Sequence, residues 1–262
     1  MEGITHVIHC AGCVKAVRVA EFYEVNEGGT RNLVVAANAA SAVQRFIQIS
    51  SLAAAGPGTR ENPARESRPS QPVSEYGRSK LAGELELQKL RGAQPVIIRP
   101  PAVYGPRDTA LLPLFKAVRR HVLPAANPGQ AVSLVYVKDL ANAVVACANH
   151  PQTAGKTYFV AGTESVTAFA FARAIAAQLG TWTVPCPLPA ALLWPICLAC
   201  EAGMRLTGRA NILSLQKFAE LRAPGWVCDA SLIRRELGFE CQTALSKGIA
   251  ETLAWYRQVR WL

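Results

Sequence analysis

The chain has 262 residues, of which 50% are hydrophobic and 18% charged, so it can bury a sizeable core and is neither disordered nor fibrous. The net charge is +10, but the basic residues are scattered and not interleaved with aromatic ones, so nucleic-acid binding is not expected. No apolar run reaches the roughly 18 residues of a membrane-spanning helix, and no signal-peptide pattern opens the chain, so we expect a cytoplasmic protein.

Short apolar runs alternate with helical patterns through the first 150 residues. Strands are predicted at 4–9, 43–49, 96–99 and 132–137, and helices at 26–40, 76–90 and 140–149. Two segments rich in glycine and proline, 51–73 and 100–113, are predicted to be long loops. This alternation predicts an α/β fold with a parallel sheet and right-handed crossovers.

The pattern changes after about residue 150. Helices are predicted at 166–179, 232–237 and 245–259, and the apolar segment 188–204 carries two prolines. We therefore expect a core at 1–150 and a smaller, mostly helical region at 151–262. The two parts are expected to interleave.

The eight cysteines include two pairs with CxxC spacing, Cys10 with Cys13 and Cys197 with Cys200. Both pairs lie in apolar runs that lack the glycines and polar residues of a zinc knuckle. We expect no metal site, and we expect most thiols to be reduced and buried as small hydrophobic groups.

The strongest chemical signal is Tyr76-Gly-Arg-Ser-Lys80, whose first and last side chains share one helical face. An ammonium beside a phenol is expected to stabilise the phenolate and to lower the phenol pKa from about 10. Ser50 and Ser51 end a predicted strand, at the edge where open α/β sheets bind ligands. A hydroxyl, a phenol and an ammonium together can relay a proton to an alcohol or a carbonyl.

These residues, with other segments in the same order along nearly the whole chain, resemble the extended short-chain dehydrogenases/reductases. The resemblance is to their NAD-dependent epimerase/dehydratase and 3β-hydroxysteroid dehydrogenase group. The matching segments are 7–12, 26–30, 49–51 with Gly56, 76–80, 99–108, 137–139, 224–229, 236–239 and 251–255. The resemblance implies a Rossmann-like sheet with a C-terminal substrate-capping region, and NAD or NADP as cofactor.

The resemblance also implies roles for individual residues. Tyr76 would be the general acid/base, Lys80 would lower its pKa and hold the nicotinamide ribose, and Ser51 would polarise the reacting oxygen. The implied cofactor contacts come from Ala11, Gly12, Asn26, Tyr76, Lys80, Pro100, Pro101 and Val103.

Structural roles are also open for four residues near this site. Asn26 fits a helix cap as well as a brace for the active-site helix, and Asp139 fits an N-cap better than a catalytic group. Ser50 is expected to be structural, and His9 is expected to be a buried core histidine.

No GxxGxxG-type turn precedes Ile4, although a dinucleotide-binding half begins with strand, glycine-rich turn and helix. Relative to the family, roughly 60–70 residues are expected to be missing, at about 30 per βαβ unit. The strand at 4–9 is then expected to be an open edge. We favour an incomplete chain over a truncated relative without cofactor, and we expect the 262-residue chain alone to bind NAD(H) poorly.

Segment 188–204, with Trp194 and little charge, falls where the family caps its substrate. It suits a steroid- or terpenoid-like substrate better than a nucleotide diphosphate, and contact with a bilayer surface or simple core packing is also open. We predict an NAD(P)-dependent oxidoreductase that acts on an apolar secondary alcohol or ketone. The alternatives are a sugar-nucleotide epimerase or dehydratase, and a non-catalytic fragment or binding protein. A homodimer formed through helices 26–40 and 76–90 is left open.

Overall fold

The computed structural model describes residues 3–40, 42–125, 127, 129–187, 190–208 and 214–262. Its elements in chain order are β1 (His6–His9), α1 (Val19–Tyr23), the π-helical turn η1 (Glu24–Gly28), α2 (Gly29–Asn38), β2 (Arg45–Ile49), α3 (Leu52–Ala55), α4 (Glu75–Glu86), the 3₁₀ turn η2 (Leu87–Lys89), β3 (Gln94–Arg99), β4 (Ala102–Tyr104), α5 (Leu112–Arg119), β5 (Val122–Ala125), β6 (Ala131–Tyr136), α6 (Val137–Asn149), the 3₁₀ turn η3 (Pro151–Thr153), β7 (Thr157–Phe159), β8 (Ser165–Thr167), α7 (Ala168–Leu179), β9 (Val184–Pro187), α8 (Ala190–Thr207), α9 (Leu215–Arg222), β10 (Gly225–Trp226), α10 (Ser231–Leu237) and α11 (Leu245–Gln258).

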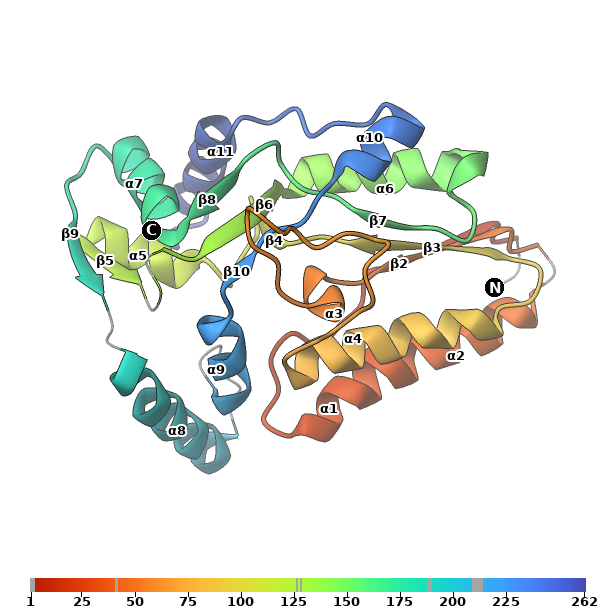
Figure 1. Cartoon of the computed structure of the whole chain (residues 1–262), viewed down its shortest axis with the longest axis horizontal. Coiled ribbons are helices and arrows are strands. Elements are labelled where there is room, and N and C mark those ends of the chain that lie inside the picture. The colour runs from red at the N-terminus through yellow and green to blue at the C-terminus, as the bar shows by residue number, and fades with distance from the viewer. Residues whose placement is uncertain (1–2, 41, 126, 128, 188–189, 209–213) are drawn as a thin grey trace.

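The main sheet is parallel, with strand order β1-β2-β3-β7. Successive side chains of a strand point to opposite faces, and β2 uses this alternation. Phe46 packs against α2 below the sheet, and Ile47 packs in the cluster that includes α6 above it (Figure 1). The predicted Rossmann-like α/β fold is confirmed.

A second sheet is formed mainly around β6, which pairs in parallel with β4 and β10 and antiparallel with β8. It packs against α7 and α11 through a cluster that includes Tyr104, Phe115 and Tyr256. Strand β7 lies beyond residue 150 yet completes the main sheet, whereas β6 precedes residue 150 and pairs with β8 and β10, which follow it. The division of the chain into 1–150 and 151–262 stays a prediction.

Strand β1 pairs with β2 alone within the described part of the chain. Its Ile8 is 46% exposed, although isoleucine in the centre of a parallel sheet is normally covered on both faces. The open edge predicted for this strand is confirmed.

Several boundaries differ from the sequence prediction for local reasons. The loop predicted at 51–73 contains α3, and the loop predicted at 100–113 contains β4, which two prolines precede. The helix predicted from Val166 begins at Ala168, because Val166 and Thr167 pair with β6 and the Thr167 side chain accepts a hydrogen bond from Ala170 N. The strand at 132–137 ends at Tyr136, where α6 starts.

Helix α8 is 18 residues long, carries Pro195 inside it, and lies at one end of the molecule next to α9 (Figure 1). It covers most of the predicted apolar segment; Leu188 and Pro189 lie outside the described residues. Over the ranges given above, no helix combines the length and the apolar character needed to cross a membrane.

Candidate active site

Helix α4 begins with a cap that places Tyr76 in its first turn. The Ser74 side chain accepts a hydrogen bond from Gly77 N at 3.1 Å, as an N-cap residue does. Lys80 follows Tyr76 by four residues and is almost completely buried. The predicted helix and the shared face of these two residues are therefore confirmed.

Gly77 lets α3 approach α4 closely. A Cβ at this position would lie 2.3 Å from Ala53 O, which no real side chain tolerates. Ser51 caps α3, accepting a hydrogen bond from Ala53 N at 3.1 Å, and its hydroxyl lies close enough to the Tyr76 phenol to lower the pKa of that phenol. The close contact of α3 with α4, which was not predictable from the sequence, thus brings the hydroxyls of Ser51 and Tyr76 together. The sequence predicted that both groups take part in the reaction.

The Tyr76 phenol is neutral in this environment. The pKa of Tyr76 is raised to about 12, mainly by desolvation and in smaller part by the charges of Glu220 and Cys13, while the neighbouring Ser51 hydroxyl acts in the opposite direction. The Phe22 ring, 6.1 Å away between centroids, forms part of the apolar surroundings. The expected lowering of the pKa is wrong for this structure, because desolvation dominates. A neutral phenol is the form that donates a proton.

Lys80 points its ammonium at the end of the neighbouring strand. Its Nζ donates to Ile49 O at 2.7 Å. Burial lowers the pKa of Lys80 to about 8, while the Glu84 carboxylate acts in the opposite direction. Lys80 is therefore mostly protonated at neutral pH and becomes neutral as the pH rises above about 8.

Asn26 ties the loop after β1 to α4. Its Oδ1 accepts from Cys13 N at 2.8 Å, and its Nδ2 donates to Cys13 O at 3.0 Å and to Ser79 Oγ at 2.9 Å. It lies inside η1 and is fully buried, so it braces the active-site helix and does not cap a helix.

A dinucleotide fits the arrangement around Gly12. A Cβ on Gly12 would lie 3.2 Å from Asn26 Oδ1 and 3.4 Å from Lys80 Nζ, so a side chain there would crowd the ammonium. An ammonium has three N–H donors, and one of them has a protein acceptor among the described residues. The other two are available for ribose hydroxyls. The exposed backbone of Ala11 and Gly12 leaves room for a dinucleotide beside them.

The segment after β3 lies beside the Ser51 loop. Pro100 O accepts from Leu52 N at 2.8 Å, and both Pro100 and Pro101 are buried. Val103, in β4, is half-buried against the cluster that includes α6. Contact of these three residues with the nicotinamide stays a prediction.

A buried ion pair, missed at the sequence level, lies directly below the site. Glu84, four residues after Lys80, accepts from Arg99 Nε at 2.9 Å and from Arg99 Nη2 at 2.5 Å. Ser50 Oγ donates to the same carboxylate, so the predicted structural role of Ser50 is confirmed. A carboxylate one turn beyond Lys80 on the same helical face was the available signal.

Two further residues have structural roles. His9 is buried with its ring 3.1 Å from Thr30 Oγ1, and burial together with the charge of Lys80 lowers its pKa; the core histidine is confirmed. The N-cap prediction for Asp139 is wrong, since α6 begins at Val137 with Tyr136 as its N-cap. Asp139 lies in the first turn, and its carboxylate accepts from Thr243 N at 3.1 Å.

The cysteines are all free thiols, and the described residues contain no group of three or more His, Cys, Asp and Glu side chains that could hold a metal. Cys147, Cys197 and Cys228 are buried, three others are half-buried, and Cys10 and Cys186 are exposed. The expectation that most thiols are buried is therefore wrong. Cys10 is exposed because it follows the open edge strand.

Comparison with known proteins identifies the family. The sequence pattern of the family described as NAD dependent epimerase/dehydratase matches residues 1–162. The chain is 32% identical to ceramide reductase of Caulobacter vibrioides over all of its own length and 77% of that protein. It is 34% identical to UDP-glucose 4-epimerase of Vibrio cholerae over 72% of this chain and 62% of that protein.

More distant similarity extends to a lipid enzyme and to solved structures. The chain is 26% identical to 3beta-hydroxysteroid-dehydrogenase/decarboxylase isoform 1 of Arabidopsis thaliana, over 96% of this chain and 62% of that protein. The UDP-glucuronic acid 4-epimerase of Bacillus cereus, solved with UDP-glucuronic acid and NAD, superposes with a TM-score of 0.75. The two are 20% identical over 98% of this chain and 76% of that one, which supports the fold.

The parallel sheet and the similarity to NAD-dependent relatives identify an NAD(P)-dependent enzyme with a Rossmann-like fold. More narrowly, the chain belongs to the NAD dependent epimerase/dehydratase family. The resemblance inferred from its motifs is thereby confirmed.

Proposed function

We propose that the protein is an NAD(P)-dependent oxidoreductase that interconverts a ketone and a secondary alcohol on an apolar, lipid-like substrate. The observation that carries the proposal is the Ser51 hydroxyl next to a neutral Tyr76, on the helix whose next turn carries the buried ammonium of Lys80. The cofactor, when bound, supplies the hydride for reduction or accepts it in oxidation.

The protein groups manage the proton and the charge. In reduction, the carbonyl oxygen gains negative charge, and the Tyr76 Oη–H donates the proton that makes it a hydroxyl. The Ser51 hydroxyl, fixed at the start of α3, would donate a hydrogen bond to the same oxygen. Lys80 would orient the ribose through its free donors and would stabilise the phenolate that remains.

Two observations support an apolar substrate. Helix α8, in the region expected to cap the substrate, exposes leucine and tryptophan side chains and few charges. The ceramide reductase, which is named for a lipid substrate, aligns with the whole chain, including α8. A site for a nucleotide diphosphate is expected to present basic and polar groups instead.

The runner-up function is a sugar-nucleotide epimerase, which the 34% identity to UDP-glucose 4-epimerase favours. An epimerase returns the hydride to its substrate, so it consumes no NAD(P)H, whereas a reductase oxidises one NAD(P)H for each product. Net consumption of the cofactor therefore separates the two. A binding protein without catalysis is a third hypothesis, and it predicts neither reaction.

The test is NAD(P)H oxidation with a set of steroid and long-chain ketones and, separately, with UDP-sugars. Because the 262-residue chain is expected to bind the cofactor poorly, NAD(P)H is supplied in large excess. Under these conditions we expect the wild-type chain to oxidise NAD(P)H with an apolar ketone, and Tyr76→Phe to lose about 10²–10⁴-fold in rate because it lacks the proton donor. Tyr23→Phe is the matched control, since the Tyr23 hydroxyl donates to Glu75 on α4 but does not touch Ser51 or Lys80. Equal rates in Tyr76→Phe and Tyr23→Phe would remove Tyr76 from the mechanism.

A further inference from the structure

Helix α8 turns an apolar face to solvent. Leu192, Trp194, Leu198 and Leu206 are each at least 41% exposed, and Leu206 reaches 88%. The other described exposed positions of α8 hold alanine, proline and threonine, with Arg205 as the one charged side chain. A surface helix of a globular protein normally carries charged and polar residues on its solvent-facing side. The solvent-facing side of α8 is apolar instead.

The opposite face of α8 accounts for its attachment to the protein. Leu193, Cys197 and Met204 are buried, and the helix packs against α9. Glu201 Oε2 accepts from Leu215 N, the first residue of α9, at 3.1 Å. With one side fixed to protein, α8 can lie along an apolar surface but is held from crossing it.

Charge on this part of the chain favours an anionic partner. Residues 180–226 contain four basic and two acidic side chains. Both acidic side chains form ion pairs, Glu201 with Arg205 and Glu220 with Lys217. A second copy of the chain would bring the same cations together, whereas an anionic lipid surface complements them.

A second exposed aromatic side chain lies just before β9, the strand that precedes α8 along the chain. Trp182 is 64% exposed, and the His121 ring stacks on it at 4.2 Å between centroids. Arg119 and Arg120 are exposed just before that histidine. Tryptophan together with arginine is typical of side chains at the level of lipid headgroups.

Helix α9 connects this face to the site. Its Glu220 acts electrostatically on the Tyr76 phenol, so α9 lies close to the reacting hydroxyl, and α8 packs on α9. An apolar surface bound by α8 would therefore lie one helix away from Tyr76.

We propose that α8 lies in the surface of an anionic lipid bilayer, with Leu192, Trp194, Leu198 and Leu206 among the acyl chains. Arg205, Arg119 and Arg120 would lie at the level of the lipid phosphates. An amphipathic helix in this position is immersed by about 5–10 Å. The route by which a lipid ketone would reach Tyr76 rests on the proposed function. The membrane contact itself is inferred from the exposed apolar face of α8 and does not depend on catalysis.

The experiment is flotation of the purified chain with vesicles of phosphatidylcholine and with vesicles that also contain phosphatidylglycerol. We expect binding to the anionic vesicles, weakened by salt, and at least tenfold weaker binding for the double variant Leu198→Gln/Leu206→Gln. Val145→Gln is the matched control, because Val145 is 56% exposed on α6 at the other end of the molecule, and it should bind like the wild type. Circular dichroism checks that all variants are folded.

Three outcomes would overturn the proposal. One is wild-type protein that does not float with anionic vesicles, and another is a double variant that binds as well as Val145→Gln. The third is a dimer of the free protein, measured by analytical ultracentrifugation, that the double variant alone abolishes, because that result assigns the face to a second copy. No cofactor or substrate is present in these assays, so failure of the proposed enzymatic function leaves their result unchanged.

Discussion

The side chains around α4 and those of α8 find their contacts in opposite ways. Around α4, buried polar groups bind one another: Asn26 makes three hydrogen bonds and Glu84 is held by Arg99 and Ser50. At α8, the buried side is a short row of apolar residues, and large apolar side chains face solvent. The first arrangement fixes the geometry that proton transfer needs, whereas the second leaves surface for contact with something outside the chain.

The largest effect is expected from breaking the buried pair below the site. Arg99→Gln leaves the Glu84 carboxylate without its cation in a place where both side chains are at most 8% exposed. We expect the free energy of unfolding, measured by urea titration, to fall by about 3–5 kcal/mol.

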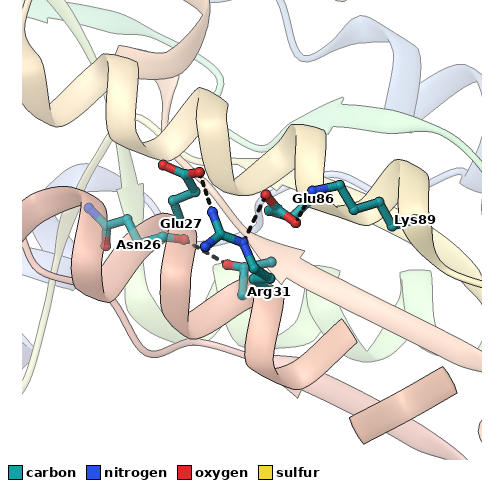
Figure 2. Close-up of polar contacts among 6 residues, drawn as sticks. Asn26, Glu27, Arg31, Glu86 and Lys89 are labelled. Carbon is teal, nitrogen blue, oxygen red and sulfur yellow. Dashed lines mark hydrogen bonds and ion pairs between the residues drawn. The ribbon is translucent and has the colours of Figure 1, made fainter. Parts of the chain in front are cut away.

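The control is the ion pair that Glu86, the last residue of α4, forms with Lys89 of η2, shown in Figure 2. Glu86 pairs there with Lys89 at 2.7 Å and with Arg31 at 3.2 Å, and both cations are at least half exposed. Lys89→Gln should cost less than about 1 kcal/mol, because the Lys89 side chain is 64% exposed and Arg31 still pairs with Glu86 in the variant. A loss for Arg99→Gln no greater than that for Lys89→Gln would show that the network below the site does not hold α4 in place.

The contrast between the two faces of α8 can be tested with one residue type. Leu193→Ala removes a buried side chain and is expected to lower the free energy of unfolding by about 2–5 kcal/mol. Leu198→Ala, on the exposed side, should change it by no more than about 0.5 kcal/mol. Equal losses in thermal or urea unfolding would mean that both faces are covered in the free protein.

The Asn26 side chain supports both the stability of the fold and the loop after β1, where Gly12 is expected to contact the cofactor. Asn26→Ala removes the hydrogen bonds to Cys13 and Ser79, so we expect a loss of about 2 kcal/mol and a higher KM for NAD(P)H as the loop at Gly12 loosens. Asn38→Ala is its control at the far end of α2, where the side chain bonds Lys89 O and Arg91 N. If steady-state kinetics give Asn26→Ala the same KM for NAD(P)H as the wild type, the hydrogen bonds of Asn26 do not contribute to cofactor binding.

The smallest effect is a shift in pH dependence. Below pH 8 Lys80 is protonated and Tyr76 is neutral, so kcat/KM for reduction is expected to be flat there and to fall as pH rises above about 8. The Glu84 carboxylate raises the pKa of Lys80, so Glu84→Gln should move this fall to lower pH. A pH profile of the folded variant that declines at the same pH as wild type would contradict the coupling.

Local patterns revealed much of the fold and the centre of the site. The YxxxK spacing predicted the shared face of Tyr76 and Lys80, and Ser51 was found because it follows a buried strand. Contacts between distant segments were not predictable, because they depend on how elements pack. The approach of α3 to α4 at Gly77 and the bond from Lys80 to Ile49 O are examples.

The wrong predictions have the same origin. Desolvation of the half-buried Tyr76, whose ring contacts that of Phe22, reverses the direction of its pKa shift, and a strand–helix contact supplies Glu84 with Arg99. Short strands such as β4 and β10 are defined by their pairing with β6 and carry no periodic pattern of their own. Sequence spacing finds reactive groups, and packing decides their protonation.

The most direct test of the central claim follows the hydride itself. The chain is incubated with NADH deuterated at the reactive ring carbon and with a steroid or long-chain ketone carried in anionic vesicles, and the lipid product is analysed by mass spectrometry. The proposed reductase predicts one deuterium on the new alcohol carbon, and none when Tyr76→Phe replaces the wild type. No labelled alcohol, together with interconversion of a UDP-sugar in a parallel incubation with NAD+ and without net formation of NADH, would contradict it and identify an epimerase.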